Sequence, residues 1–417
     1  MEYLCIDLKC FYASVECVER GLDPYTTPLV VADESRGKGT ICLAISTKMK
    51  TLGVKNRCRL FQIPTHIKYM IAKPRMKKYI DYAAKIYGIY LKYIAKEDIH
   101  VYSIDKAFLD ITHYRNLYQK SGSEIGKMIM DDIYDTTGLT ATCGVGTNLY
   151  LAKVALDIYA KKINSNIAYL DEKLYKEKLG DHLPLTDFWQ IGKGISKRLN
   201  KLGLNTMIDV ANANEDALYK EFGVNASFLI EHAHGRESTK ISDIKAYKPK
   251  AKSVSNGQIL ERNYTYNEAL LAVKEMVELL CLELIGQKQV TNHISLGVGY
   301  DDSLNVKATG GSRKLDVTTN SYEILYKEIV NLYKERTHKN TDIRRLNVAF
   351  GNLQDESCES YSLFDDVERI EKEKKLLTTV HQIKEKYGNS SVMRLMNLEE
   401  SATTIKRNKL IGGHNAE

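Results

Sequence analysis

The stretch that decides the fold is residues 100–112, His-Val-Tyr-Ser-Ile-Asp-Lys-Ala-Phe-Leu-Asp-Ile-Thr. Its side chains alternate with a period of two, which predicts a strand, or two short strands that meet at a tight turn near Asp105. An acid in such an apolar strand is costly to bury without a partner, and a divalent cation is a common partner. Asp7 repeats the signal, because it ends the short apolar run 3–6.

Two strands that each bring one carboxylate to the same end of a sheet are the arrangement with which a phosphoryl-transfer site holds Mg²⁺. The sequence around the two acids is more specific. Residues 6–16, Ile-Asp-Leu-Lys-Cys-Phe-Tyr-Ala-Ser-Val-Glu, together with residues 103–110, Ser-Ile-Asp-Lys-Ala-Phe-Leu-Asp, resemble the Y-family (translesion, ImpB/MucB/SamB-like) DNA polymerases. Near the end, residues 411–414, Ile-Gly-Gly-His, resemble the tails of a UV-damage-repair subgroup of that family in Gram-positive bacteria.

Composition is that of a globular protein too long for a single core, with 417 residues, 43% of them hydrophobic and 27% charged. A formal net charge of +7 is compatible with a polyanionic partner. There is no apolar run of membrane-spanning length and no secretion signal in residues 1–30, so we expect no membrane association and a cytoplasmic, bacterial location, on the nucleoid when bound to DNA. The eight cysteines form no C-x-x-C pair, which favours free thiols over zinc.

The resemblance implies an α/β multidomain fold, a right-hand polymerase with an α/β palm, small fingers and a helical thumb. Periodicity in the last third predicts the order strand, helix, strand, strand, helix, strand, which is ferredoxin-like and matches the family's little finger. The expected domains are the palm (1–10 and 73–164), fingers (11–72), thumb (165–237), a flexible basic linker (238–252), little finger (253–352) and a C-terminal tail (353–417).

In the family, two Mg²⁺ ions share the positions of Asp7 and Asp105, the backbone carbonyl of Leu8 helps to hold the nucleotide-bound ion, and a glutamate at the position of Lys106 helps to hold the primer-side ion. These ions serve transfer of a nucleotide from a dNTP to the primer 3′-OH. Lys106 removes one carboxylate and adds a cation, so the primer-side ion is disfavoured. Asp110 cannot replace the missing acid, because four residues of strand span roughly 13 Å.

Nucleotide-binding positions implied by the resemblance are Phe11, Tyr12, Lys50 and Lys161. The ring at position 12 is the steric gate that excludes a ribose 2′-OH, and the two lysines reach the triphosphate, with Lys161 preferred over Lys162. Pattern alone leaves a plainer interpretation open, in which Tyr12 is an aromatic at the core boundary and the lysines cover solvated helix faces.

Positions that we expect to contact DNA lie in the thumb, the linker and the little finger. Gly192 and Gly194 open a helix as in a helix–hairpin–helix, where backbone N–H groups bind phosphate. Basic residues supply further phosphate contacts, although ordinary sheet-edge charge explains each of them singly: Lys252, Arg262, Arg313 and Arg344.

A short peptide in the tail, residues 360–364, Ser-Tyr-Ser-Leu-Phe, resembles the segment by which bacterial polymerases dock on the sliding clamp. Tyr361, Leu363 and Phe364 are the expected anchors. The expected partners are therefore primer–template DNA and the sliding clamp, and nothing in the sequence sets an oligomeric state.

Three functions remain open at this point. The first is a damage-tolerant DNA polymerase of DNA repair and the SOS response, with activity possible or lost depending on whether Lys106 is tolerated. The second is a non-catalytic protein that occupies primer termini or the clamp and regulates polymerase access. The third is another palm-fold enzyme such as a nucleotide cyclase, which needs neither the thumb hairpin nor a basic linker.

Overall fold

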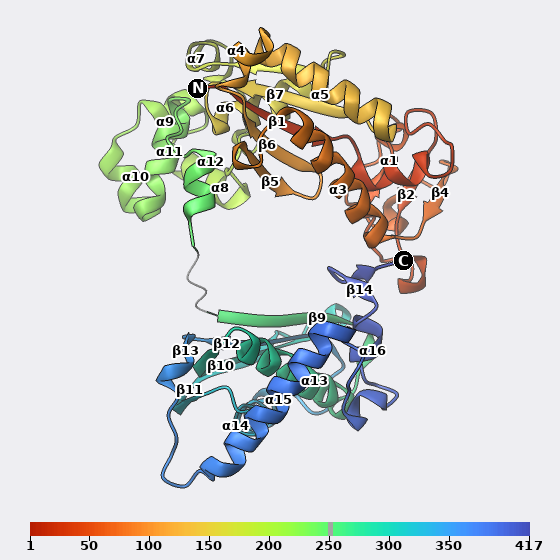
Figure 1. The fold of residues 1–417 in the computed structure, drawn as a ribbon, viewed down its shortest axis with the longest axis vertical. Coiled ribbons are helices and arrows are strands. Elements are labelled where there is room, and N and C mark those ends of the chain that lie inside the picture. Colours follow the sequence, from red (N-terminus) through yellow and green to blue (C-terminus); the bar gives the residue numbers. More distant parts are fainter. Residues whose placement is uncertain (249–252) are drawn as a thin grey trace. The chain divides into compact units, whose positions relative to one another are not determined.

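The computed structural model describes residues 1–248 and 253–417. They form two compact units, one of Met1–Lys248 with His414–Glu417 and one of Pro249–Gly413 (Figure 1). Lys252, predicted to bind DNA, lies outside the described residues. None of the helices within the described ranges combines the length and apolarity that crossing a membrane requires.

The first unit is built on a five-stranded sheet in the order β5-β6-β1-β7-β8, which we call the palm sheet. Its strands are β1 (Tyr3–Leu8), β5 (Ile99–Ser103), β6 (Lys106–Asp110), β7 (Ala141–Gly146) and β8 (Ile167–Leu170). The long amphipathic helices α3 (Met76–Tyr93) and α5 (Gly122–Thr137) pack on each other, α5 contacts β7, and the short α4 (Tyr114–Tyr118) precedes α5. The palm sheet is thus an α/β layer, as the sequence predicted.

The stretch 100–112 folds as a hairpin. β5 and β6 pair antiparallel on either side of the turn at Ile104 and Asp105, and β6 pairs antiparallel with β1 so that Asp7 lies opposite Lys106. The backbone N–H of Leu8 donates to the carbonyl of Asp105 at 3.0 Å. The prediction of two short strands meeting near Asp105 is confirmed, and Asp110 lies at the far end of β6, opposite Tyr3.

Helix α6 (Leu149–Val154) lies close against β7 because two glycines leave room for its backbone. A Cβ on Gly144 would lie 2.1 Å from the carbonyl oxygen of Ala152, and one on Gly146 would lie 2.1 Å from the Ala152 nitrogen. After α6 the chain continues as a π-helical segment, Ala155–Tyr159, and a 3₁₀ turn, Ala160–Lys162. The widened, π-helical segment carries Asp157, and the 3₁₀ turn carries Lys161, which contacts Asp7 at the end of β1.

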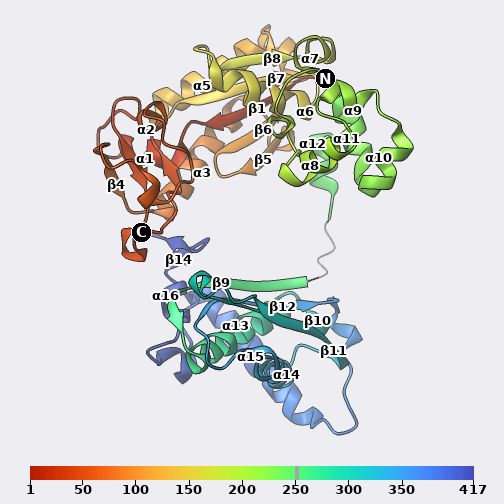
Figure 2. The same cartoon turned by 180° about the vertical axis from the view of Figure 1, so that it is seen from behind.

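The two ends of the first unit hold smaller groups of elements. The predicted fingers contain α1 (Phe11–Val18), α2 (Thr47–Thr51) and the sheet β3-β2-β4, made of β2 (Leu29–Val31), β3 (Ala44–Ile45) and β4 (Met70–Ala72). The predicted thumb contains α7 (Glu172–Leu179), α8 (Lys193–Lys201), α9 (Met207–Ala211), α10 (Glu215–Phe222) and α11 (Ala226–Ala233). Figure 2 shows α8–α11 and β2–β4 on opposite sides of the palm sheet. The short β15 (His414–Asn415) also belongs to this unit.

Two predicted boundaries need correction. β8 falls within the residues predicted as thumb, yet it pairs in parallel with β7, so the palm sheet extends past residue 164. The flexible linker predicted from residue 238 is wrong for residues 241–246, which form helix α12 (Ile241–Ala246). Ile241 is 2% exposed and lies in a cluster with Tyr3 and Phe108, and the partly buried Ile244 packs against the same cluster, so two isoleucines fix this segment to the palm.

The second unit begins with the predicted β-α-β-β-α-β order: β9 (Ser253–Tyr264), α13 (Tyr266–Gly286), β10 (Gln289–Tyr300), β11 (Thr309–Thr319), α14 (Tyr322–Arg336) and β12 (Ile343–Gly351). The sheet order is β11-β10-β12-β9, with all neighbours antiparallel. Helices α13 and α14 cover one face, and their apolar residues form one core with alternate residues of the strands.

The tail packs on this second unit. Its elements are β13 (Gln354–Asp355), α15 (Val367–Tyr387), α16 (Thr404–Arg407) and β14 (Leu410–Ile411). Leu377 of α15 lies buried against Leu282 and Ile285 of α13. The buried carboxylate of Glu275 accepts hydrogen bonds from the backbone N–H groups of residues 403 and 404, which satisfies that charge and holds the last part of the tail.

Candidate active site

A pocket of about 540 Å³ lies where β1 and the β5–β6 hairpin end, next to α1 and α2. Its size is within the usual range of small-ligand sites. The structure brings together here every residue predicted for catalysis, metal binding or nucleotide binding: Asp7, Leu8, Phe11, Tyr12, Lys50, Asp105, Lys106 and Lys161. These residues come from four separate stretches of the chain, which is why their meeting depends on the fold.

The two acids of the pocket are both bound by lysine. The Lys106 ammonium lies 3.4 Å from Oδ1 of Asp7 and 3.0 Å from Oδ2 of Asp105, so it bridges the two carboxylates. Nζ of Lys161 lies 2.6 Å from Oδ2 of Asp7, and the hydroxyl of Ser103 donates to Oδ1 of Asp105 at 2.6 Å. All four carboxylate oxygens therefore already have a protein donor.

The charges of this cluster reinforce one another. Burial alone raises the pKa of Asp105, but the hydrogen bond from Ser103 and the positive charge of Lys106 outweigh it and hold that pKa below its ordinary value. Burial alone lowers the pKa of Lys106, yet Asp7 and Asp105 raise it above its ordinary value. The pKa of Lys161 is likewise raised by Asp7 and Asp157 against the effect of burial. Asp105, Lys106 and Lys161 are thus charged at neutral pH.

Magnesium would find an incomplete set of ligands in this pocket. Asp7, Asp105 and the Leu8 carbonyl supply oxygen donors, but within residues 1–248 and 253–417 no group of three or more acidic, histidine or cysteine side chains is arranged to hold a metal ion. The Lys106 ammonium also occupies the position between the carboxylates that a bridging cation would take. The residues present therefore do not fit the two-ion site that the resemblance implies.

Lys161 is positioned by a second acid. Its Nζ lies 2.7 Å from Oδ1 of Asp157, and Lys153 contacts the other oxygen of the same carboxylate. Burial raises the pKa of Asp157, but Lys161 and Lys153 outweigh that effect and lower it. The π-helical segment thus holds Lys161 against Asp7 from the side of α6, a placement that the sequence offered as one of two adjacent lysines.

The aromatic floor of the pocket rests on a buried ion cluster. The Tyr12 ring stacks on the ring of Tyr79 at a centroid distance of 4.3 Å and an interplanar angle of 16°. The Tyr79 hydroxyl donates to Oε1 of Glu16 at 2.8 Å, and Glu16 also accepts from Arg75 and Arg20. Glu16 is 0% exposed, so these donors are what makes its burial possible. Sequence reasoning missed this cluster, although an acid on the buried face of an apolar helix was the available signal.

The polar lining residues for which no role was predicted include Lys9, Asn56 and Arg57. Lys9 directly follows the Leu8 position, and its side chain donates to Asn166. Arg57 has a left-handed backbone with φ of 58°. The run Lys55-Asn56-Arg57 downstream of Lys50 was the only sequence signal, and it resembles any basic loop.

The predicted DNA contacts differ in how far they are already engaged. Gly192 precedes α8 and Gly194 lies in its first turn, and a Cβ at either position would meet nothing within 4 Å, so the backbone there is open to a ligand. Arg262 is paired with Glu268 and lies over the ring of Tyr264. Arg313 pairs with two glutamates, Glu328 at 2.9 Å and Glu335 at 2.8 Å. The last of the predicted DNA contacts, Arg344, lies in β12 and is partly exposed.

The clamp-like peptide, residues 360–364, lies between β13 and α15. Leu363 is 100% exposed and Phe364 is 97% exposed, while Tyr361 is 39% exposed. Two large apolar side chains that face solvent side by side are unusual on a protein surface unless a partner covers them.

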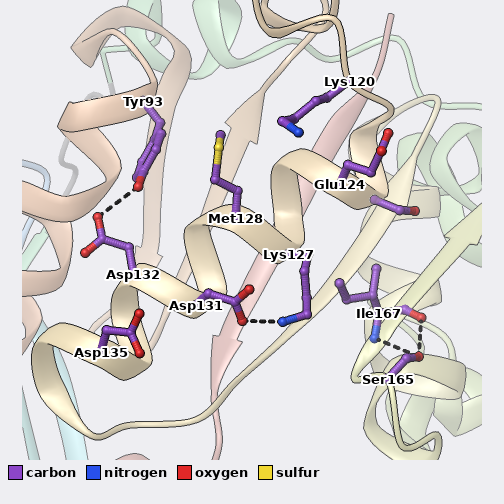
Figure 3. A pocket seen from close by; sticks show the side chains of 11 residues that line it. Tyr93, Lys120, Glu124, Lys127, Met128, Asp131, Asp132, Asp135, Ser165 and Ile167 are labelled. Atoms are coloured by element: carbon purple, nitrogen blue, oxygen red, sulfur yellow. Dashed lines mark hydrogen bonds and ion pairs between the residues drawn. The ribbon is translucent and has the colours of Figure 1, made fainter.

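A second depression lies on the outer side of α5, lined by surface residues between Tyr93 and Ile167 (Figure 3). Two of its four carboxylates are paired with lysines: Asp131 with Lys127, and Asp132 with Lys92. None of the residues predicted for a site lines it. We therefore assign no function to it.

The sequence and the fold are both similar to those of known proteins. The model of the impB/mucB/samB family matches residues 6–157, and the model of the C-terminal domain of that family matches residues 251–363. UvrX of Bacillus subtilis, a protein named for UV-damage repair, is 32% identical over 414 residues, which cover 99% of this chain and 97% of that protein. DNA polymerase IV 2 of Bacillus subtilis is 28% identical over 419 residues, covering 98% of this chain and 97% of that protein.

Solved structures give the same fold. A Y-family DNA polymerase chimera of Dbh and Dpo4 matches with a TM-score of 0.62 at 22% identity, covering 85% of this chain and 100% of that chain. A post-insertion binary complex of Dbh DNA polymerase matches with a TM-score of 0.52 at 23% identity, again covering 85% of this chain and 100% of that chain. The arrangement of elements is therefore that of a multidomain polymerase.

Proposed function

Because this chain belongs to the impB/mucB/samB family and has the fold of Y-family DNA polymerases, we propose that it is a template-directed translesion DNA polymerase of DNA damage repair whose nucleotidyl transfer is impaired by Lys106. The observation that carries the impairment is the Lys106 ammonium, 3.0 Å from Asp105 and 3.4 Å from Asp7. A lysine and a divalent ion about 4 Å apart repel by roughly 8 kcal/mol at an effective dielectric near 20, before relaxation.

The remaining pocket residues keep roles that do not depend on that ion. Phe11 and Tyr12 form the apolar floor on which the sugar and base of a dNTP lie, and the Tyr12 ring blocks a ribose 2′-OH. Lys50 and Lys161 bind the triphosphate. Asp7, Asp105 and the Leu8 carbonyl are the groups that would hold a divalent ion here, and such an ion would supply charge stabilisation to the attacking and leaving oxygens; Lys106 takes the place of a further oxygen ligand.

Primer–template DNA is the proposed macromolecular substrate, held through its phosphates and therefore in a salt-sensitive way. Gly192 and Gly194 support this proposal best, because their backbone is open. Arg344 and Arg262 add charge in the second unit, whereas Arg313 is held by two glutamates and contributes least. The proposed location of this DNA binding is the cytoplasm, with the protein on the nucleoid when DNA is bound.

The test is primer extension with Mg²⁺ and dNTPs, comparing this chain with Lys106→Glu, while fluorescence anisotropy follows binding to the same primer–template. We expect equal DNA binding, little or no extension by this chain, and extension by the glutamate variant. Lys162→Glu, which makes the same charge change outside the pocket, should not restore extension. Extension by this chain at the rate of Lys106→Glu would refute the impairment.

A second candidate function follows from the same observation. A site in which every carboxylate oxygen is bound by a protein donor suits a non-catalytic protein that occupies primer termini and regulates other polymerases. In the experiment above, DNA binding without extension by either Lys106→Glu or the unaltered chain would favour this function.

The sliding clamp is the proposed protein partner, because Leu363 and Phe364 present an exposed apolar pair next to Tyr361. Replacing both Leu363 and Phe364 by alanine should abolish binding to an immobilised clamp. The matched control replaces Leu395 and Leu398, which are also exposed, and should leave binding unchanged. Equal loss in both double variants would show that the apolar pair is not a specific anchor.

A further inference from the structure

The charge balance of the pocket is strongly positive. Its lining carries five cationic side chains, Lys9, Lys50, Arg57, Lys106 and Lys161, against the two carboxylates of Asp7 and Asp105. The excess is three positive charges in one cavity, and a glutamate at position 106 would reduce that excess to one. Clefts lined by one sign of charge concentrate ligands of the opposite sign.

The two carboxylates are also neutralised from within. Lys106 bridges them, and Lys161 holds the second oxygen of Asp7. A polyanion that enters the pocket therefore meets no uncompensated acid, and it needs no separate cation to offset one. In a pocket with three acids, by contrast, repulsion between those acids and a triphosphate has to be cancelled by a bound divalent ion.

We propose that this pocket binds the triphosphate of a nucleotide without a divalent cation, with Lys106 acting as the built-in counter-ion of Asp7 and Asp105. The ligand chemistry is a linear triphosphate, carried by a dNTP or present as inorganic triphosphate. This inference rests on the proposed function for the identity of the nucleotide site, but it concerns binding alone and involves no chemical step. It goes beyond the family's use of the site, where the triphosphate arrives with its metal.

Besides Lys106 and Lys161, three further cationic side chains line the pocket and can bind the ligand. Lys50 lies in the last turn of α2, Arg57 lies in the loop that follows, and Lys9 follows β1, so they approach the pocket from different elements. Lys161 lies between Asp7 and Asp157 with its side chain 38% exposed, which leaves one side open to an incoming phosphate. Multiple lysine and arginine contacts to phosphate oxygens are strong charge-assisted hydrogen bonds.

The experiment is isothermal titration of the full chain with dATP and, separately, with inorganic triphosphate, each in EDTA and in excess Mg²⁺. We expect dissociation constants in EDTA and in Mg²⁺ that agree within about threefold for this chain. Tighter binding of dATP than of inorganic triphosphate would identify the nucleotide as the better ligand through contacts of its nucleoside. Binding that requires Mg²⁺, or no binding in EDTA, would overturn the proposal.

Three variants locate the effect. Lys106→Glu should bind triphosphate about tenfold or more weakly in EDTA and regain affinity in Mg²⁺. Lys106→Met, which removes the cation without adding an acid, should also weaken binding in EDTA and should gain little from Mg²⁺. Lys162→Glu changes the net charge equally but lies outside the pocket lining, and it should bind like the unaltered chain. Far-ultraviolet circular dichroism confirms that each variant is folded.

The outcomes separate this inference from the proposed function. If Lys106→Glu extends primers but the unaltered chain binds triphosphate only with Mg²⁺, the inference fails and the proposed function stands. If the unaltered chain binds triphosphate in EDTA but Lys106→Glu extends nothing, the inference stands and the polymerase proposal fails. Equal binding by Lys106→Met and the unaltered chain in EDTA would refute the role of Lys106.

Discussion

Glu16 offers the sharpest test of what holds the pocket floor in place. Its side chain is fully buried, and it accepts hydrogen bonds from Tyr79 at 2.8 Å and from Arg75 at 3.0 and 2.8 Å, with a further bond from Arg20. Burial alone raises the pKa of Glu16, but Arg75, Arg20 and Tyr79 outweigh it and lower that pKa, so the carboxylate is ionised when folded. The replacement Glu16→Gln removes the charge and keeps the volume.

The magnitude follows from the donors. A glutamine retains one acceptor oxygen, so at least two charged hydrogen bonds are lost, each worth about 1.5–3 kcal/mol. The new amide N–H also faces the guanidinium donors. Removing one partner of a buried ion pair costs about 3–5 kcal/mol in total in other proteins, a figure that already includes the lost hydrogen bonds. The Arg20 and Arg75 side chains keep some contact with solvent, at 35% and 31% exposure. We expect Glu16→Gln to lower the free energy of unfolding of the first unit by about 3–5 kcal/mol.

Urea unfolding followed by tryptophan fluorescence measures this loss directly. Trp189 is the only tryptophan of the chain and lies against Phe108 in the first unit, with ring centroids 5.8 Å apart, so its emission reports on that unit. The matched control is Glu19→Gln. The Glu19 side chain is 24% exposed, pairs with Lys78 and accepts a hydrogen bond from Tyr82, and its replacement should change stability by about 1 kcal/mol or less. A Glu16→Gln variant within 1 kcal/mol of the unaltered chain would refute the reasoning.

The remaining predictions concern pH and packing. Burial alone raises the pKa of Glu237, but the hydrogen bond from His232 outweighs it and lowers that pKa to about 2. Because the folded pKa is depressed, this stabilisation is complete above about pH 5 and is lost as the pH falls toward 2, so Glu237→Gln should flatten the acid side of the stability profile. Gly146→Ala should lower the free energy of unfolding by about 1–3 kcal/mol or more, because the new Cβ would lie 2.1 Å from the Ala152 nitrogen. The change is measured as a lower urea midpoint. Gly194→Ala, which has open space, should leave stability unchanged or raised by up to about 1 kcal/mol.

Much of the fold was predictable because the periodic patterns are long. The first helix and the second strand of the predicted β-α-β-β-α-β order are α13 (Tyr266–Gly286) and β10 (Gln289–Tyr300). In both, burial follows the pattern of apolar residues, so sequence and core agree. The prediction of a flexible linker after residue 238 was wrong because the helix there is short. Helix α12 has only six residues, with Ile241 buried and Ile244 partly buried, and two apolar residues over so short a helix give too little periodicity to detect.

The sequence predicted which residues line the pocket, but it did not predict which of them form ion pairs with one another. Asp7 and Asp105 each end or join a strand, so their meeting at one end of the palm sheet follows from hairpin geometry and one antiparallel pairing. The contact between Asp7 and Lys161 spans more than 150 residues and depends on the widened helix after α6, which no local pattern encodes. Sequence therefore names the charges in the pocket, whereas their pairing has to come from the structure.

That pairing changes the meaning of the substitution at position 106. Judged from sequence, a lysine beside two metal-binding acids only subtracts a ligand and repels an ion. In the folded chain the same lysine satisfies one oxygen of each acid, and the pKa of Lys106 is raised because that position stabilises its charge. The acids of this pocket are already neutralised without a metal. Five cationic side chains line the pocket, so in our proposal a nucleotide triphosphate needs no divalent cation to balance its charge there. The proposed impairment of catalysis and the proposed metal-free binding would thus both follow from one contact, and Lys106→Met tests them separately because it removes the contact without restoring the ligand.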